Sequence, residues 1–424
     1  MHRLVLHNLG PVKDCDINVN DFMVFTGPQA SGKSTIAKAV YFFRTVKDEL
    51  WFSLVMNTEN ETPDEWRTRF LNILTRKLDR LLFLSSAVPK NLEMTYYYTD
   101  TTSISIRHSR TPALLKPLEF SFSDSISEYM DKLRQNVLTN LDWNQRGDER
   151  ENICRLFNDN TGCLFIPAGR SMISSMTSQL SGLLASLDDR QKMEIDYSVQ
   201  AYLNTVQALQ PLFKSGLGGL LLDKIPEKRR NSQFIEKALD LIKKILKGRY
   251  QYSMGAERFY FGPGENDYVM MKQASSGQQE AVWITNIVFY HLTGEKSIFL
   301  IVEEPESNLY PDTQKKITEL LSLFRSAGNQ VLITTHSPYV LGTLNNLIYA
   351  SDIAAEGTPD VEKVIDRELW LDRDAVSAWH MGDGEPTPAT EPEMGLIRNE
   401  YIEGASEEIN REGDKLYEIS AKEE

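Results

Sequence analysis

Long hydrophobic runs and cysteine pairs are both missing from this sequence of 424 residues. The clearest uninterrupted apolar run is Ile298 to Val302, whereas a membrane-spanning helix needs about 20 predominantly apolar residues, so we expect no membrane partner. Cys15, Cys154 and Cys163 cannot all pair with one another, and none lies in a C-x-x-C spacing. This scarcity argues against a disulfide framework or a zinc site and favours a reducing, cytoplasmic location.

Basic residues are scarce near the end of the chain. The net charge is −14, from 46 basic and 60 acidic residues, and residues 351–424 alone account for it with 21 acids and 7 bases. This segment is either a solvated tail or a surface that docks a partner and repels DNA. The opposite case is residues 224–249, with nine bases and three acids. They form either a solvated helix face or a contact with a nucleic-acid backbone.

The hydrophobic periodicity predicts an α/β fold with a mixed central sheet, an antiparallel β-meander and a helical insert. Expected strands lie within residues 1–25, 91–123, 163–166, 249–272, 297–303 and 330–335. Expected helices lie within residues 63–85, 124–157, 172–247, 277–292 and 312–327. Tyrosines 96–98 could stack on nucleotides, although ordinary strand packing is favoured, and residues 382–392 are typical of a loop or linker.

The strongest motif is a glycine-rich loop between an expected strand and an expected helix, which fits G-x-x-x-x-G-K-[ST]. Its two glycines let several backbone amides face one phosphate, and the following helix adds its positive end. Lys33 is expected to reach the β- and γ-phosphates of ATP, and Ser34 to ligate Mg²⁺. The expected ATP-binding residues are Gly27, Pro28, Gln29, Ala30, Ser31, Gly32, Lys33, Ser34 and Thr35.

Two acidic residues follow the apolar run that ends at Val302. A buried parallel strand delivers such side chains to the edge of the sheet where ligands bind. We expect Glu303 to hold Mg²⁺ through water and Glu304 to polarise the attacking water.

Two shorter motifs could complete the site. Small residues that open a helix leave backbone amides for an anion, although Ser275 could instead be a plain helix cap with Glu280 closing a capping box. His336 directly follows an expected buried strand and could contact the γ-phosphate, whereas the other five histidines have no constellation around them. The ligand-binding candidates in the first motif are Ser275, Ser276, Gly277 and Gln278.

The order of these motifs resembles that of ABC-type ATPases of the AAA family. It is most similar to the non-transporter branch of OLD, SMC and RecF-like proteins, which includes ATPase subunits of bacterial anti-phage defence systems. The resemblance implies that 274–278 is the signature motif, Glu304 the catalytic glutamate, 307–309 the D-loop and His336 the switch histidine. Residues 166–170 resemble an Ile-Pro-Ala-Glu-Arg strand motif of these proteins, and no role follows for Arg170.

The resemblance implies one ATPase lobe interrupted by inserted segments. Its parts are residues 1–60 with the P-loop, 61–160 with the β-meander and helices, 161–250 with a strand and a helical insert, 251–350 with the signature, Walker B and His-switch motifs, and 351–424 as an acidic C-terminal segment. Lys33 and Ser276 are 243 residues apart, which disfavours a transporter. The acids after residue 355 are too close together, and too few residues follow them, for a toprim nuclease domain.

Two functions follow from the resemblance. The first is an ATP- and Mg²⁺-dependent switch that dimerises, or forms a higher oligomer, through ATP and controls a separate effector, expected to be a nuclease, in a bacterial or phage-related defence system. The second is an SMC- or RecF-like repair or recombination ATPase that clamps DNA. The sequence departs from the family at Glu303 in place of Asp, Gln29 in place of Asn and Gly169 in place of Glu, and it offers no secure Q-loop glutamine.

Overall fold

The central element of the fold is a six-stranded sheet, in the order β14-β13-β3-β12-β11-β7. The structure is a computed structural model that describes residues 2–56, 61–84, 91–108, 118–135, 143–174, 194–223, 232–262, 266–398 and 400–420, with a few single residues between these ranges. The strands are β3 (Phe22–Thr26), β7 (Gly162–Ile166), β11 (Ile298–Glu303), β12 (Gln330–Thr334), β13 (Val376–Gly382) and β14 (Glu385–Pro388). Neighbours pair in parallel except β14, which is antiparallel to β13.

Both faces of this sheet are covered, which explains the continuous apolar runs of β3 and β11. Successive side chains point to opposite faces, so Val24 and Val302 lie in one hydrophobic core and Phe25 and Ile301 in the other. The first core is formed with helices α7, α9, α10, α11 and α12, and the second with α1 and α2. The bounds are α1 (Lys33–Val55), α2 (Pro63–Leu82), α7 (Tyr197–Leu209), α9 (Ser232–Leu246), α10 (Ser276–Leu292), α11 (Pro311–Ser326) and α12 (Pro338–Ala355).

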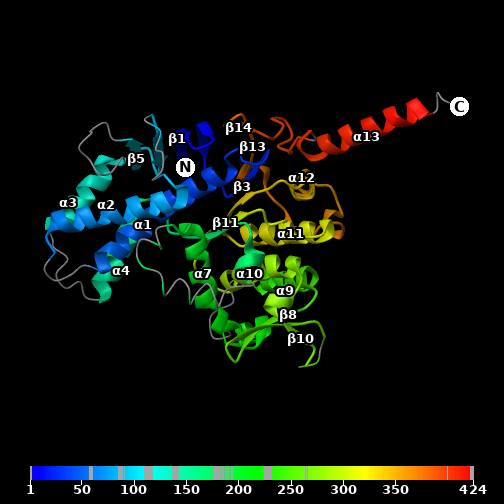
Figure 1. Ribbon diagram of the computed structural model, residues 1–424, viewed down its shortest axis with the longest axis horizontal. Helices are drawn as coiled ribbons and strands as arrows, with labels where there is room; N and C mark the ends of the chain where they lie inside the picture. Colours follow the sequence, from blue (N-terminus) through cyan, green and yellow to red (C-terminus); the bar gives the residue numbers. More distant parts are fainter. Residues whose placement is uncertain are drawn as a thin grey trace.

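A second sheet is antiparallel, with the strand order β2-β1-β4-β5-β6, and it confirms the expected meander. It joins the hairpin of β1 (Arg3–Leu9) and β2 (Val12–Asn18) to β4 (Glu93–Tyr97), β5 (Ser103–His108) and β6 (Leu118–Phe122). It lies beside α1, α2, α3 (Asp124–Gln135) and α4 (Trp143–Leu156) at the blue and cyan end of the molecule (Figure 1). Tyr96 and Tyr98 are 0% and 1% exposed, so the tyrosine run packs in the core rather than stacking on a ligand.

The helical insert forms a separate layer with a small three-stranded sheet, below α10 and α11 in Figure 1. Its described parts are α7, α8 (Gly216–Asp223), α9, β8 (Arg249–Ser253), β9 (Ala256–Tyr260) and β10 (Tyr268–Met270). The expected strands within 249–272 are therefore confirmed. Residues 224–231, most of 175–193 and Pro263 of the expected Gly-Pro-Gly turn lie outside the described residues.

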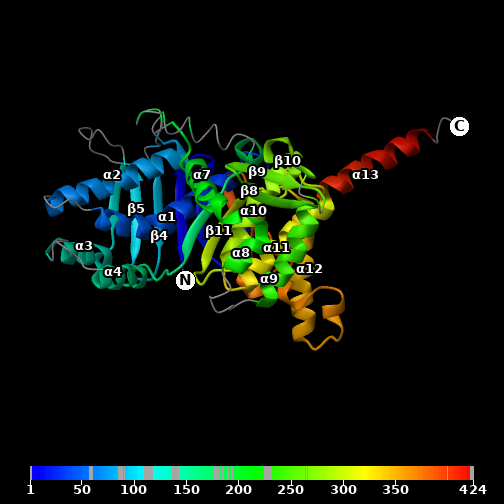
Figure 2. The ribbon, with the colours of Figure 1, turned by 90° about the horizontal axis from the view of Figure 1, so that it is seen from below.

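The C-terminal segment contributes two strands to the six-stranded sheet. The loop predicted for residues 382–392 was wrong, because Glu385–Pro388 forms β14 and pairs with β13. The glycines, prolines and acids of this segment are typical of a turn, and β14 itself is largely exposed, whereas Met381 on β13 and Ala389 directly after β14 are both 0% exposed. After this hairpin, α13 (Glu400–Ser420) packs its first turns near α12 and then projects away from the rest of the ribbon (Figures 1 and 2).

Two sequence expectations can be compared directly with the described residues. No helix in the described ranges is long and apolar enough to cross a membrane. The three cysteines are free thiols.

Candidate functional site

The glycine-rich loop leaves the carboxyl end of β3 and leads directly into α1, as expected. Gly27 and Gly32 have φ angles of 136° and 105°, in the region that favours glycine. A Cβ atom at Gly27 would lie 2.5 Å from the backbone oxygen of Met381 on β13. The close approach of β13 therefore requires glycine at this position and shapes the loop.

Lys33 folds back across the loop. Its Nζ donates to the backbone oxygens of Gly27 at 3.0 Å and Pro28 at 2.7 Å. Burial lowers the pKa of the Lys33 ammonium, and the carboxylates of Glu304 and Glu306 act in the opposite direction. The loop thus places one cation among backbone groups, close to the acids of β11.

The two acids at the end of β11 occupy different environments. Glu303 is 5% exposed, and its Oε2 accepts a hydrogen bond from the Ala168 amide at 3.2 Å. Its Oε1 is buried and accepts no hydrogen bond from the described residues. Because buried polar atoms normally have a partner, this free oxygen fits a role beside Mg²⁺.

Glu304 is a strained residue with a left-handed φ of 43°, which is uncommon outside glycine. Its amide donates to the Thr334 backbone oxygen at 2.9 Å, and this bond fixes the turn after β11 to the end of β12. Its Oε2 accepts from Ser307 Oγ at 3.1 Å, and its Oε1 lies 3.7 Å from His336 Nε2. The carboxylate and the imidazole therefore lie side by side, 3.7 Å apart, so that a single ligand could contact both groups.

Arg170 connects these acids to the helix that begins at Ser276, a role that the sequence did not reveal. Its side chain is 0% exposed. One Nη donates to the Glu303 backbone oxygen at 2.6 Å and the other to that of Glu304 at 2.8 Å. Its Nε lies 3.0 Å from Glu280 Oε2 on α10. A single buried guanidinium therefore holds both acidic residues by their backbone.

The start of α10 also contacts the turn after Glu304. The Asn308 backbone oxygen would lie 2.8 Å from a Cβ atom at Gly277, so this position requires glycine. Asn308 Nδ2 is 3.4 Å from Glu280 Oε1. The capping box exists, but Gln278 closes it rather than Glu280, which is instead the ion-pair partner of Arg170. Ser275 and Ser276 are exposed at this helix start.

The loop that carries His336 is held by Glu306, a second residue that the sequence analysis missed. Glu306 Oε1 accepts from Thr335 Oγ1 at 2.7 Å and from the His336 amide at 2.8 Å. Ser337 caps α12 through the amides of Tyr339 and Val340. His336 is therefore presented by a fixed turn, with a partly exposed imidazole.

His380, left without a role by the sequence analysis, lies close to this site. It follows Trp379 on β13, and its register partner is Thr26 at the end of β3. Burial lowers its pKa, with a smaller opposing effect of Glu400 and a further lowering by Lys33. Its ring stacks on Tyr401 with 4.3 Å between the ring centroids. The alternation of Val376 and Ala378 with Ser377 is a strand signal in the sequence that could have indicated this position.

A phosphate loop between a strand and a helix, with acids at the end of a parallel strand in the same sheet, defines a P-loop NTPase. A family model described as an AAA ATPase domain matches residues 100–341, more than half of the chain. The chain belongs to this family and is an ATP-hydrolysing enzyme. The family implies a nucleotide and usually Mg²⁺, and Lys33, Ser34 and the free oxygen of Glu303 are the groups that would hold them.

Solved structures with a similar outline include SMC heads and an ATP-binding cassette. The SMC head domain from Thermotoga maritima has 11% identity and a TM-score of 0.38, over 92% of this chain and 98% of that one. An Smc head domain bound to the C-terminal domain of ScpA, derived from Pyrococcus furiosus, has 12% identity and a TM-score of 0.39, over 97% and 100%. An ATP-binding cassette bound to ADP and Pi has 13% identity and a TM-score of 0.32, over 91% and 96%. No curated protein sequence matches the chain.

Proposed function

We propose that this ATPase is an ABC-type switch in which two copies enclose two ATP molecules, and that the enclosed state controls a separate effector protein. The observation that carries the proposal is that one buried side chain, Arg170, joins the helix start at Ser276 to the carbonyls of Glu303 and Glu304. A partner's ATP that contacts this helix start would therefore act directly on the residues that hydrolyse the chain's own ATP.

The exposed groups support a composite site. Ser275 and Ser276 face solvent at the start of α10, and residues 28–30 and Ser34 are exposed on the phosphate loop. The helix start and the phosphate loop are therefore both accessible to a second copy of the chain. Helix starts attract phosphate through their free amides, so Ser276 of one copy would cap the γ-phosphate held by Lys33 of the other.

The chemistry assigned to each residue follows from its place. Lys33 would neutralise charge on the β- and γ-phosphates, and Ser34 with Glu303 would hold Mg²⁺, which would supply further positive charge to these phosphates. Glu304 accepts a proton from the attacking water, and His336, 3.7 Å away across the site, contacts the γ-phosphate. Gly27 to Thr35 supply the amides that surround the phosphates.

The C-terminal segment supports a separate effector. Helix α13 carries exposed acids, among them Glu407 and Glu412, and an apolar row at a spacing of seven residues. The first member, Ile402, packs against the core, but Ile409 and Leu416 are 67% and 68% exposed. An acidic helix with an uncovered apolar row suits a basic partner with a complementary groove. We place this effector, a nuclease, in a bacterial or phage-related defence system.

The described residues give less support to a DNA clamp. Of the bases in residues 224–249, Lys237 pairs with Asp366 and Lys244 with Asp240. Lys243, Lys247 and Arg249 line a cavity. The other bases of this window lie outside the described residues.

The dimer is tested with two inactive chains. We expect Glu304→Gln to bind ATP, to lose turnover by about 100-fold or more and to accumulate as an ATP-bound dimer on a sizing column. Ser276→Arg and Lys33→Ala should each be inactive alone and should recover part of the activity when mixed, because one composite site in the mixed dimer is intact. Absence of recovery with mixing confirmed would show that Ser276 acts on its own chain's ATP.

The effector is tested separately. The purified chain with ATP and Mg²⁺ should leave plasmid, linear duplex, single strands and tRNA intact. The product of an adjacent gene should form a complex that weakens with salt and is lost in Ile409→Asp/Leu416→Asp but kept in Glu128→Gln, a control at an exposed acid of α3. Nuclease activity that co-elutes with the chain and survives Glu304→Gln would contradict a separate effector.

A further inference from the structure

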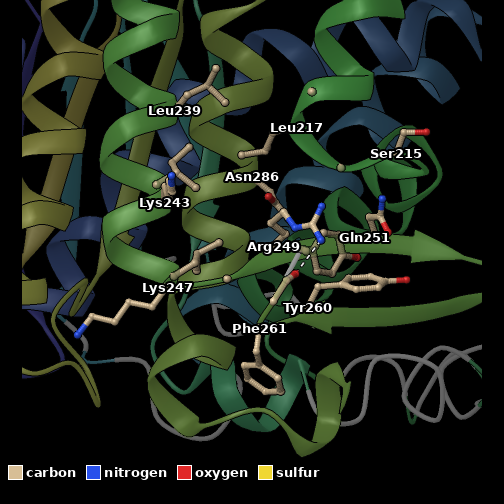
Figure 3. A pocket seen from close by; sticks show the side chains of 17 residues that line it. Ser215, Leu217, Leu239, Lys243, Lys247, Arg249, Gln251, Tyr260, Phe261 and Asn286 are labelled. Atoms are coloured by element: carbon tan, nitrogen blue, oxygen red, sulfur yellow. Dashed lines mark hydrogen bonds between the residues drawn. The ribbon is translucent and has the colours of Figure 1, made fainter. Parts of the chain in front are cut away.

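A cavity of about 980 Å³ lies between the helical insert and α10, away from the phosphate loop. Its walls come from α8, α9, β8, β9 and one residue of α10, Asn286 (Figure 3). Asn286 is ten residues beyond Ser276, which places it about 15 Å along the helix from the proposed phosphate contact. The volume lies within the range of small-molecule sites.

Asn286 is the unusual residue of this cavity. It is 0% exposed, and neither its Oδ1 nor its Nδ2 has a hydrogen-bond partner among the residues that the structure describes. Buried amides almost always find partners, so an asparagine with two free atoms at a cavity wall needs an explanation. Figure 3 shows its side chain beside Arg249 and near Tyr260, whereas the ring of Phe261 lies farther away along the wall. The surrounding wall is mainly aliphatic, from residues such as Leu217 and Ile242.

The charge of the cavity has one sign. Lys243, Lys247 and Arg249 are among its lining residues, and none of the described lining residues is acidic. Arg249 is oriented by a hydrogen bond from its Nη2 to the Gly262 backbone oxygen at 2.9 Å. Lys243 on α9 and Lys247 directly after this helix are both exposed. Their neighbour Lys244 instead pairs with Asp240 and does not line the cavity, which makes it a matched control.

Three chemical requirements follow for a ligand. A side-chain amide pairs with a group that offers a donor and an acceptor side by side, as the edge of a nucleobase does. Phe261, which is 55% exposed, offers an aromatic face on which such a ring can stack. The cations suit a phosphate.

We propose that this cavity binds a small nucleotide, of one or two units, with its base against Asn286 and its phosphate near Lys243 and Lys247. The site is distinct from the ATP site, and the proposal does not depend on the dimer or on an effector. A bounded cavity with a buried amide favours a free nucleotide over a nucleic-acid strand, which needs an open groove.

The experiment uses the full chain with Lys33→Ala, so that the phosphate loop does not compete for the probes. Calorimetric titration with AMP, GMP, CMP and UMP should show one site per chain for at least one of them, at concentrations below about 10 mM. Asn286→Leu, which has a similar volume, should weaken this binding about tenfold or more. Its folding is checked by thermal unfolding, which should show no loss because the wild-type amide has no partner.

A second variant keeps the proposal testable if Asn286→Leu does not fold. Lys243→Gln/Lys247→Gln changes only exposed side chains and should weaken binding and reduce its salt dependence, whereas Lys244→Gln should leave both unchanged. The proposal is overturned if no nucleotide binds in this range or if Asn286→Leu binds equally well. It is also overturned if inorganic phosphate binds as tightly as the nucleotides, or if a twelve-nucleotide single strand binds more tightly without needing Asn286.

Discussion

The two large sheets of this protein differ in what they hold. The parallel strands of the six-stranded sheet carry the phosphate loop, both acids of β11 and the loop with His336, all at one edge. The antiparallel sheet of β2, β1, β4, β5 and β6 packs beside α1, and in its described part it contributes none of these site residues, although Val12 of β2 packs against Gly32 of the phosphate loop. The carboxyl ends of parallel strands lie at one edge of the sheet, so side chains from distant parts of the chain meet there. In an antiparallel meander the carboxyl ends of successive strands lie at opposite edges.

The largest expected effect comes from breaking the connection at Arg170. Arg170→Met leaves Glu280 as an unpaired buried charge and frees the carbonyls of Glu303 and Glu304. We expect the free energy of unfolding to fall by about 3–5 kcal/mol, measured by urea titration. ATP turnover should fall about 100-fold from misplacement of the acids.

The double variant Arg170→Met/Glu280→Leu separates these two effects. It removes the unpaired charge, so stability should largely return while kcat stays low and the affinity for ATP is kept. Recovery of kcat together with stability would show that Arg170 only stabilises the fold.

A matched pair of glycines compares the two sheets directly. Gly27 and Gly10 both have positive φ. An added Cβ would meet the Met381 backbone oxygen at Gly27, whereas at Gly10, in the hairpin of the antiparallel sheet, it would meet no described atom within 4 Å. Gly27→Ala should weaken ATP binding by about 100-fold by calorimetry, since the loop must move away from β13. Gly10→Ala should cost about 1–2 kcal/mol of stability and leave ATP affinity unchanged. If both variants lost the same amount of ATP affinity, the phosphate loop would not depend on the contact between Gly27 and β13.

The smallest effect concerns pH and the antiparallel sheet. Burial, together with the charge of Arg44, lowers the pKa of His2 to about 4, and its Nδ1 lies 3.0 Å from Tyr96 Oη. The unfolded chain therefore binds the proton first, so this contribution to stability is present above about pH 6.5 and is lost as pH falls toward 4.

Between pH 7.5 and 5.5 the native chain should lose about 1 kcal/mol more stability than His2→Gln. Urea titrations of both chains at the two pH values measure this difference. Turnover per folded molecule should be the same in both chains, because His2 does not contact the ATP site. Parallel pH curves for the two chains would show that His2 is not the titrating group.

Local motifs were predictable because their geometry depends on neighbouring residues. The phosphate loop, the strand ending in Glu303 and Glu304, the meander and the helix after Ser275 all follow from residue spacing, and the structure places them as expected. Arg170 and Glu306 were not predictable, because each acts on residues more than 25 positions away that only the sheet brings near. The strand Glu385–Pro388 was missed because its composition is that of a turn, and pairing with β13 overrides that preference.

The position of β3 in its sheet also determines when the protein becomes able to bind ATP. Strand β3 is complete at residue 26, but its two neighbours, β12 and β13, follow more than 300 residues later. At about 5–20 residues per second, the ribosome needs roughly 20–70 seconds from the end of β3 to the end of β13. During that interval the residues of the phosphate loop are already synthesised, but Met381 is not yet there to shape them. The phosphate loop therefore takes its final shape, and the chain becomes able to bind ATP, only after β13 has been synthesised.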